Sequence, residues 1–472
     1  MHANLPALSR ALLLSTSAVA LALAASPARA DNLTFVPGDL VVSVYGDGDG
    51  SGSYGDNQAA PIVLQQLTTT GLSAGQMTLP QTNFASNGVQ NYAISGEYGS
   101  SSEGTLQLSG DGQSLVIAGY GVNAATFNAG GAAVYGTAAL AQSTPSGSLT
   151  QGSTITPVSR VVADISYTGS VDTSTSLNNV FNGNNPRSVA TVNGSTFYVS
   201  GQGQSGDTTE GLFVAQDGAS TATAINTTYD TRTVEISNNT LYVSQDSKVG
   251  KGQLAFIASV GTPGTLPTGP TTPSILSGVV TGSPKSADPG ELKLSAGQGN
   301  SINLSSGSIY LSPENYFFAN ATTLYVADSG DPKAGGVGDG GLQKWVLQNG
   351  TWTLEYTISA GLNLVNATTA TSGTTGLIGL TGEVVGDSVE LFATNATLGD
   401  LDQTYLYGVD DQLNATTNPG DTFSVLETAA PDTIIRGVAF APSADQVPEP
   451  ASMAALGFGL AGLMAVRRRR RA

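Results

Sequence analysis

The residues best placed for chemistry in this sequence are acidic side chains in a glycine-rich segment, DGDGSGSYGDNQ, at residues 47–58. Asp47, Asp49 and Ser51 alternate as oxygen donors in the order of an EF-hand calcium loop. The twelfth position of this loop is a glutamine instead of the usual bidentate glutamate, so Asp56 is the candidate to replace it. The segment therefore predicts a Ca²⁺ site. The alternative is an acidic hairpin loop between two strands.

A second acidic segment, DSGDPKAGGVGDGG, covers residues 328–341 and contains Asp328, Asp331 and Asp339. It follows a predicted strand, and loops on a rigid scaffold often carry function. Aspartate is also the ordinary choice where a strand ends in a turn. We therefore interpret this segment as structural first and as a candidate binding loop second.

The composition excludes several kinds of catalysis. The only histidine is His2, and the chain has no cysteine. Without imidazole or thiol after residue 30, there can be no Ser-His-Asp or Cys-His catalysis and no zinc, haem or cluster ligation by these side chains. Carboxylate chemistry, acid–base catalysis by tyrosine or lysine, and oxygen-ligated Ca²⁺ or Mg²⁺ remain possible.

The elements that would position such residues are predicted to be β-strands. The sequence contains 60 glycines and many short Val, Leu and Tyr runs, and we find no helical periodicity between residues 31 and 446. A hairpin pattern recurs, with an Asn-rich turn between two strands. Its copies lie at residues 188–203, 233–247 and 316–330, with more distant ones at 106–121 and 380–397.

Each hairpin is followed by a glycine-rich link and one or two further strands, as at residues 210–225, 252–261, 342–358 and 403–409. Four strands per unit are typical of a β-propeller blade. The second strands are expected near residues 41, 115, 197, 241, 324 and 389. We therefore predict an all-β fold with a single β-propeller of six blades, with seven as the alternative.

The two ends of the repeat region complete this prediction. Residues 434–442 form a last strand with no following hairpin, and residues 39–48 begin with no preceding strand. Pairing the last strand with the first would close the ring and protect its edges. Trp345 and Trp352 flank an Asn-Gly turn, and we interpret them as core residues instead of a sugar-stacking platform.

The N-terminus has the pattern of a secretory signal peptide. Arg10 precedes an apolar run at residues 11–25, and Ala28 and Ala30 follow as a small-x-small cleavage site. We expect cleavage before Asp31, with an N-terminal anchor as the weaker alternative. The predicted domains are therefore a signal peptide at 1–30 and a propeller at 31–446.

The C-terminus carries a second targeting pattern. Its parts are Val447, Pro448, Glu449 and Pro450, an apolar run at residues 451–466, and Arg467, Arg468, Arg469, Arg470 and Arg471. A helix of 16 residues spans about 24 Å, which is short for a bilayer core of about 30 Å. The order of these parts resembles the PEP-CTERM sorting signal of Gram-negative bacteria, at residues 447–472. This resemblance implies recognition by an exosortase and processing of the tail, whereas the alternative is an ordinary C-terminal membrane anchor.

The body also resembles a group of exported bacterial propeller proteins of unassigned function, often PEP-CTERM-tagged. The resemblance rests on GDLVVSVYGDG at 38–48, GNNPRSVAT at 183–191, LYVADSG at 324–330 and IRGVAFAP at 435–442. It implies a fold and a compartment, but no activity.

Charge narrows the choice of partner. Residues 31–446 contain 10 of the 17 Lys and Arg and 34 of the 35 Asp and Glu, for a formal charge of −24. Nucleic acid is thereby an unsuitable partner, since phosphate binding needs clustered basic residues. An acidic surface favours binding of cations.

We therefore expect a non-enzymatic protein of the cell surface, outer membrane or extracellular matrix, exported by the Sec machinery and sorted by an exosortase. Its expected partner is a polysaccharide, a surface protein or a calcium-bridged polymer, with Ca²⁺ as the one candidate cofactor. The alternative is a hydrolase, either a glycosidase with paired carboxylates or an enzyme similar to calcium-dependent propeller lactonases. Candidate acidic residues for that alternative are Glu210, Glu235, Glu314, Asp328 and Glu383.

Overall fold

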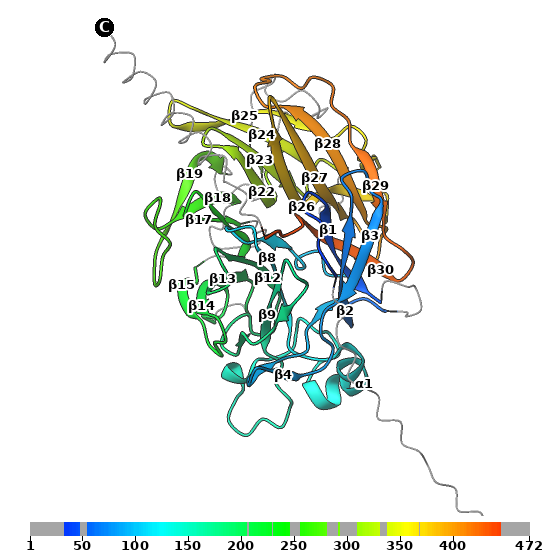
Figure 1. The fold of residues 1–472 in the computed structure, drawn as a ribbon, viewed down its shortest axis with the longest axis vertical. Coiled ribbons are helices and arrows are strands. Elements are labelled where there is room, and N and C mark those ends of the chain that lie inside the picture. The colour runs from blue at the N-terminus through cyan, green and yellow to red at the C-terminus, as the bar shows by residue number, and fades with distance from the viewer. Residues whose placement is uncertain are drawn as a thin grey trace, which may run out of the picture.

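The computed structural model describes residues 33–47, 54–204, 207–228, 230–245, 255–280, 291–292, 309–330, 338–367 and 369–444. Strands dominate these residues, as the sequence predicts (Figure 1). The signal-peptide segment and the C-terminal sorting segment lie outside the described residues. Within the described part of the chain, no helix is long and apolar enough to cross a membrane.

Four sheets share one simple architecture, in which four consecutive strands each lie antiparallel to the next. The first sheet contains β12 (Pro186–Thr191), β13 (Thr196–Gly201), β14 (Gly211–Gln216) and β15 (Thr223–Asn226). The second contains β16 (Thr231–Ser237), β17 (Thr240–Gln245), β18 (Phe256–Val260) and β19 (Pro273–Val280). The third contains β22 (Pro313–Asn320), β23 (Thr323–Asp328), β24 (Gly341–Gln348) and β25 (Thr351–Ile358). The fourth contains β26 (Thr374–Val385), β27 (Ser388–Thr397), β28 (Tyr405–Gln412) and β29 (Ser424–Thr428).

The remaining large sheet has ten strands, seven of them in the order β10-β9-β8-β6-β2-β1-β30. These are β10 (Val171–Asp172), β9 (Arg160–Ser166), β8 (Ser114–Tyr120), β6 (Ser95–Glu97), β2 (Ala59–Leu67), β1 (Leu40–Gly46) and β30 (Thr433–Phe440). Three short strands attach to it, namely β3 (Ser73–Thr78), β7 (Gln107–Leu108) and β11 (Ser176–Leu177). Two small hairpins, β4 (Phe84–Ser86) with β5 (Val89–Asn91) and β20 (Glu291–Leu292) with β21 (Ile309–Tyr310), complete the strands.

The last strand of the chain pairs with the first, as the sequence predicts. β1 and β30 are antiparallel, with Leu40 opposite Phe440 and Gly46 opposite Thr433. Val42 and Val438 also face each other in this pair and are almost fully buried. The β1–β30 seam therefore joins chain segments almost 400 residues apart through backbone hydrogen bonds and a common apolar core.

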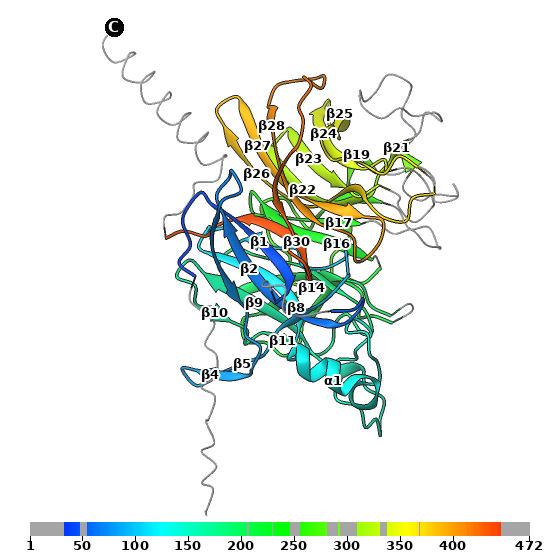
Figure 2. The ribbon, with the colours of Figure 1, turned by 90° about the vertical axis from the view of Figure 1, so that its right-hand side faces the viewer.

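The first strands of the sheets lie side by side around a central axis. β12 contacts β16, β16 contacts β22, β22 contacts β26, and β26 contacts β30. β7 contacts both β30 and β12. The sheets fan out from these strands in a propeller-like arrangement (Figures 1 and 2).

Asparagine-rich hairpin turns separate many of the strands, which explains why the strand pattern could be predicted from the sequence. Asn238 and Asn239 have φ values of 48° and 55°, and Asn349 and Gly350 have 52° and 82°. Two successive residues with positive φ are the requirement of a tight two-residue hairpin. Trp345 and Trp352 lie on either side of the second turn and are 1% and 7% exposed, so they pack in the core.

One helix corrects the expectation that the body contains none. α1 (Ala124–Tyr135) lies in the link between β8 and β9, and its N-terminus is capped by the Asn123 side chain, which accepts a hydrogen bond from Thr126 N. Gly131 interrupts it with φ +45°. The helix was missed because its glycine- and alanine-rich sequence has no apolar stripe of helical period.

A buried ionic cluster joins the third and fourth of the four-stranded sheets. Lys344 Nζ lies 2.9 Å from Asp411 Oδ2, and both side chains are 0% exposed. Tyr356 donates to Asp411 Oδ1 at 2.7 Å, and Tyr325 donates to Oδ2 at 2.5 Å. Lys344 also donates to the Tyr356 hydroxyl at 3.0 Å. The cluster satisfies both charges, which is the condition for burying an ion pair without a large penalty.

Candidate functional site

Two cavities follow one another along the first strands of the sheets. The first, here called the arginine cavity, is lined by Arg187, Arg232, Arg436, Glu103 and Glu314, among others, and has a volume of about 20 Å³. The second, here called the glutamate cavity, is about 140 Å³. The same strands line both.

The order along each strand shows that the cavities are stacked. On β16, Arg232 lines the arginine cavity and Glu235 the glutamate cavity. On β30, Arg436 lines the first and Val438 the second. In each strand the residue nearer the strand's start belongs to the arginine cavity, so this cavity lies toward the end of the axis where the first strands begin.

Arg187 reaches the arginine cavity from β12. It forms an ion pair with Asp230 and donates to Thr231 O at 3.0 Å and to Gln202 Oε1 at 2.9 Å. Its side chain is 4% exposed. Burial lowers the pKa of this guanidinium, although Asp230 partly offsets the effect. These contacts hold Arg187 in one position between two sheets.

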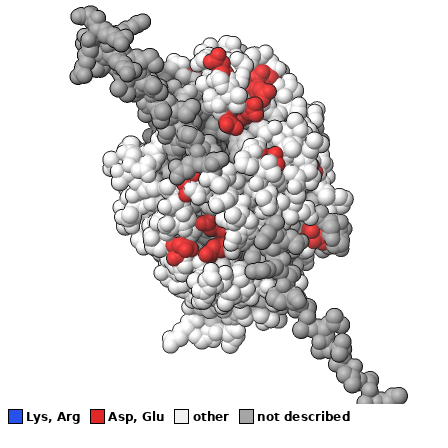
Figure 3. Space-filling model, viewed as in Figure 1, with Lys and Arg blue, Asp and Glu red and all other residues white. Residues whose placement is uncertain are grey.

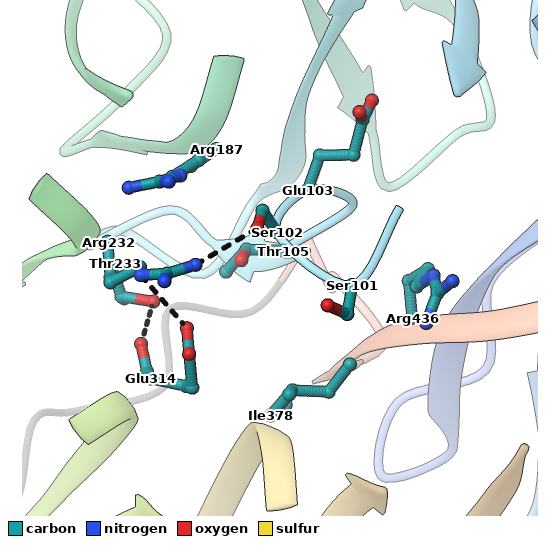
Figure 4. A pocket seen from close by; sticks show the side chains of 11 residues that line it. Ser101, Ser102, Glu103, Thr105, Arg187, Arg232, Thr233, Glu314, Ile378 and Arg436 are labelled. Carbon is teal, nitrogen blue, oxygen red and sulfur yellow. Dashed lines mark hydrogen bonds and ion pairs between the residues drawn. The ribbon is translucent and has the colours of Figure 1, made fainter. Parts of the chain in front are cut away.

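Arg232 and Glu314 form the second ionic contact of the cavity. Arg232 Nε lies 3.5 Å from Glu314 Oε2, and Arg232 Nη1 donates to Ser102 Oγ at 3.0 Å (Figure 4). Thr233 Oγ1 donates to Glu314 O at 2.7 Å, which joins β16 to β22. The side chains of Arg232 and Glu314 are 15% and 12% exposed, so solvent reaches the cavity at this ion pair.

Arg436 lines the arginine cavity from β30, and Figure 4 places it on the far side of Ser101 from Arg232. Its side chain is almost fully buried, and burial lowers the pKa of its guanidinium to about 10. The group stays protonated at neutral pH and is therefore a buried positive charge.

A plug segment, residues 100–106, runs through the arginine cavity between β6 and β7 (Figure 4). Ser43 donates to Gly104 O at 2.6 Å and accepts a hydrogen bond from Gly437 N at 2.8 Å. Gly104 has φ +88°, and a Cβ atom there would lie only 2.6 Å from Arg436 Cβ. The plug thus packs directly on the stem of Arg436 and needs glycine at this position.

Two carboxyl groups are buried beside the plug. Glu103 accepts hydrogen bonds from Asn185 Nδ2 at 2.8 Å, Tyr120 OH at 3.2 Å and Glu97 N at 3.2 Å. Glu97 accepts a hydrogen bond from Ala141 N. Burial raises the pKa of Glu97 to about 8, with the neighbouring Glu103 charge as a second cause. Burial likewise raises the pKa of Glu103 to about 7. The pair can hold a proton at neutral pH.

The glutamate cavity combines one carboxyl group with walls of mixed polar and apolar side chains. Leu106, Phe317 and Leu380 are among its lining residues, and Glu235 is the acidic one. Burial raises the pKa of Glu235 to about 8. Gln107 crosses the axis beside it and donates to Val234 O at 2.6 Å. A neutral carboxyl in such a cavity can donate a proton or a hydrogen bond.

The structure describes half of the calcium site predicted from the sequence. Asp47 and Asp56 stand at the two ends of the link between β1 and β2, and Asp56 Oδ2 accepts a hydrogen bond from Asn57 Nδ2 at 2.6 Å. Asp49 and Ser51 lie outside the described residues, so the calcium site stays a prediction. Among the residues that the structure does describe, no three acidic side chains are grouped so as to hold a metal ion.

The acidic candidates for a lactonase-like centre do not converge. Glu314 lies in the arginine cavity and Glu235 in the glutamate cavity. Asp328 is fully buried and accepts hydrogen bonds from Ser312 N, Gly330 N and Gln343 Nε2 at 2.8–2.9 Å. Glu383 is exposed near the end of β26, and Glu210 is half-buried just before β14.

Sequence reasoning missed the arginines of the central axis. A signal was nevertheless present, because residues 31–446 contain only four arginines, Arg160, Arg187, Arg232 and Arg436. In the structure these four residues lie in β9, β12, β16 and β30, within a region of very low basic content. Scarce basic residues at corresponding strand positions could have indicated a shared internal site.

Among the described residues, the basic side chains lie inside the protein, whereas many acidic side chains are exposed. Of the basic residues that the structure describes, Arg160, Arg187, Lys344 and Arg436 are at most 3% exposed, and Arg232 is half-buried. On the face drawn in Figure 3, the described surface shows acidic side chains and no basic ones. Exposed acidic residues include Asp217, Glu383, Asp387, Asp400 and Asp410.

Residues 446–470 match the family described as the PEP-CTERM protein-sorting motif. The chain ends in a PEP-CTERM motif. A PEP-CTERM motif implies export, transient anchoring in the membrane and recognition by an exosortase, as the sequence predicts. None of the curated proteins matches the chain.

Solved structures with a similar arrangement of strands include β-propeller domains. A chain in the crystal structure of a nidogen–laminin complex has a TM-score of 0.39 and 12% identity, and the match covers 85% of this chain and 98% of that one. The β-propeller domain of the Trilobed protease from Pyrococcus furiosus has a TM-score of 0.33 and 9% identity over 83% of this chain and 99% of that one. Similarity at this level carries no information on activity.

Proposed function

We propose that the protein is an exported six-bladed β-propeller that binds an extracellular polymer without catalysing a reaction. In this proposal β30, β1, β2 and β3 form one blade, β7 to β10 form the next, and the four-stranded sheets form the other four. The contacts among the first strands and the pairing of β30 with β1 support this assignment.

The observation that carries the binding proposal is the segregation of charge. The described basic side chains are internal, whereas exposed acidic side chains are spread over several sheets. A surface of this kind repels a polyanion at short range, and a divalent cation shared between two carboxylates converts the repulsion into attraction. Acidic residues are thus the right groups for a calcium-bridged contact and the wrong ones for a direct contact with an acidic polymer.

The proposed polymer is therefore an acidic polysaccharide of the cell surface or extracellular matrix, held through Ca²⁺. The segment with Asp47, Asp49, Ser51 and Asp56 is the proposed first point of cation binding, since it offers alternating oxygen donors. In this proposal the sorting motif delivers the propeller to the polymer and is then removed, so the final location is outside the inner membrane.

A retention experiment tests this function. The mature protein from its native host is passed over a polyuronate resin in Ca²⁺, in Mg²⁺ at equal ionic strength, and in chelator. We expect retention in Ca²⁺ but not in Mg²⁺ or chelator. We expect no retention on a neutral dextran resin under any condition. Equal retention in chelator, or none in Ca²⁺, would contradict the proposal. The variant with Asp47, Asp49 and Asp56 replaced by Asn is then passed over the same resin. Loss of retention in Ca²⁺ would assign binding to this loop, whereas unchanged retention would assign it to acidic residues elsewhere on the surface.

One observation favours a hydrolase as the second candidate. Glu235 has a raised pKa and lines a cavity large enough for several water molecules. As a general acid it would need a second carboxylate, and the lining residues supply none in the described part of the chain. Turnover of lactone or glycoside substrates that is lost in Glu235→Gln, with the fold intact, would favour this candidate over binding.

A further inference from the structure

The arginine cavity contains buried cationic donors that have no partner. Arg436 Nε, Nη1 and Nη2 and Arg187 Nε are each buried and donate to no acceptor among the residues that the structure describes. Arg436 is 2% exposed and Arg187 is 3% exposed. Buried N–H groups on a charged side chain are costly to leave without an acceptor. An acceptor should therefore occupy the space beside them.

The carboxylates near these arginines are already engaged. Asp230 pairs with Arg187, and Glu314 pairs with Arg232. Glu103 also lines the cavity, but its carboxyl group accepts hydrogen bonds from Asn185, Tyr120 and Glu97 N. Its raised pKa leaves it partly protonated at neutral pH. Arg436 has no hydrogen-bonded counter-ion among the described residues, and the carboxyl groups that act on it are the partly protonated Glu103 and the exposed Asp400, so its positive charge is only partly compensated.

The size of the cavity limits what can supply the missing charge. A volume of about 20 Å³ exceeds the roughly 10–15 Å³ needed by one water molecule. A space of this kind suits a small inorganic ion. Water would accept hydrogen bonds from Arg436 but would leave the excess charge uncompensated, whereas a monatomic anion does both.

We infer that the arginine cavity is a binding site for one small inorganic anion, with chloride as the physiological ligand, held by Arg436. The anion compensates the charge of Arg436 and supplies an acceptor for its unpaired N–H groups. Because the plug segment packs on the stem of Arg436 through Gly104, the bound anion also holds residues 100–106 in the axis. This site is internal and independent of the proposed binding surface.

Direct detection of the anion is the first test. Crystals of the mature protein are grown with sodium bromide in place of sodium chloride, and the anomalous signal of bromine is measured. We expect one strong peak within hydrogen-bond reach of the Arg436 guanidinium. Ordered water at that place with no anomalous peak would overturn the inference. This measurement uses the unmodified protein and does not depend on whether any variant folds.

The second test measures linkage between chloride and stability. A ligand that binds only the folded state raises its stability in a saturable way, so the melting temperature should rise with chloride but not with gluconate at equal ionic strength. Arg436→Lys keeps the charge but loses donors, and we expect about tenfold weaker chloride binding, the loss typical of one charge-assisted hydrogen bond. Arg160→Lys is the matched control, because Arg160 is equally buried and lies outside the cavity. An unchanged chloride response in Arg436→Lys, or an equal loss in Arg160→Lys, would refute the assignment.

Discussion

The ionic cluster around Lys344 gives a sharp prediction about stability. In Asp411→Asn the side chain keeps its shape and loses its charge, so the buried Lys344 loses its ion-pair partner and keeps only the electrostatic interaction with Asp421. The side chains of Lys344 and Asp411 are both 0% exposed, and hence solvent cannot compensate the lysine. Removing one partner of a buried ion pair lowers the free energy of unfolding by about 3–5 kcal/mol. We expect urea unfolding of the mature protein to show a loss of this size in the free energy of unfolding.

Two comparisons make this prediction refutable. Asp410 is the neighbouring residue on β28 and is exposed, so Asp410→Asn should change stability by less than about 0.5 kcal/mol. The double variant Lys344→Met, Asp411→Leu removes both charges, and its loss should be clearly smaller than the sum of the losses in the single variants Lys344→Met and Asp411→Leu. If Asp411→Asn matches Asp410→Asn, or if the double variant is additive, the cluster does not act as a buried ion pair.

Three further predictions concern the axis. The pKa values of Glu97 and Glu103 in the folded protein, about 8 and about 7, lie above the ordinary 4.5, so the folded state keeps protons that the unfolded state releases. Stability should therefore fall as pH rises from about 4.5 to 8, and Glu97→Gln should flatten the slope of urea midpoints against pH. Gly104→Ala should cost about 1–3 kcal/mol more than Gly386→Ala, because both glycines have positive φ but only Gly104 is in contact with Arg436. Val438→Asp should cost about 4 kcal/mol or more and remove hydrogen-exchange protection from β1, since it places a charge in the β1–β30 seam.

The strands of this fold were predictable because their signals are local. A turn such as Asn238-Asn239 requires positive φ, which few residue types adopt, and it marks the hairpin whatever the rest of the chain does. The expected second strands near residues 41, 115, 197, 241, 324 and 389 correspond to β1, β8, β13, β17, β23 and β27. By contrast, the joining of β2 to β8 through the three-residue strand β6 has no sequence signature.

The arginine cavity was not predictable from local patterns because its residues come from distant parts of the chain. Arg187, Arg232 and Arg436 line one cavity only because the first strands of three sheets converge. The plug between β6 and β7 has the composition of an ordinary Ser- and Gly-rich loop, GSSSEGT, so nothing in it indicates burial. Its place in the axis depends on Gly104, whose fit against Arg436 is a tertiary property.

The pairing of β30 with β1 also determines when the protein can finish folding. During export the C-terminal end of the chain crosses the membrane last. Therefore β1 cannot pair with β30 until nearly the whole body has been translocated. The sorting motif begins at residue 446, six residues after Phe440, a length of chain that spans at most about 20 Å. In the anchored precursor the pairing of β30 with β1 thus takes place close to the membrane, where the exosortase also recognises the motif. We therefore expect the fold to be completed close to the place where the exosortase recognises the motif.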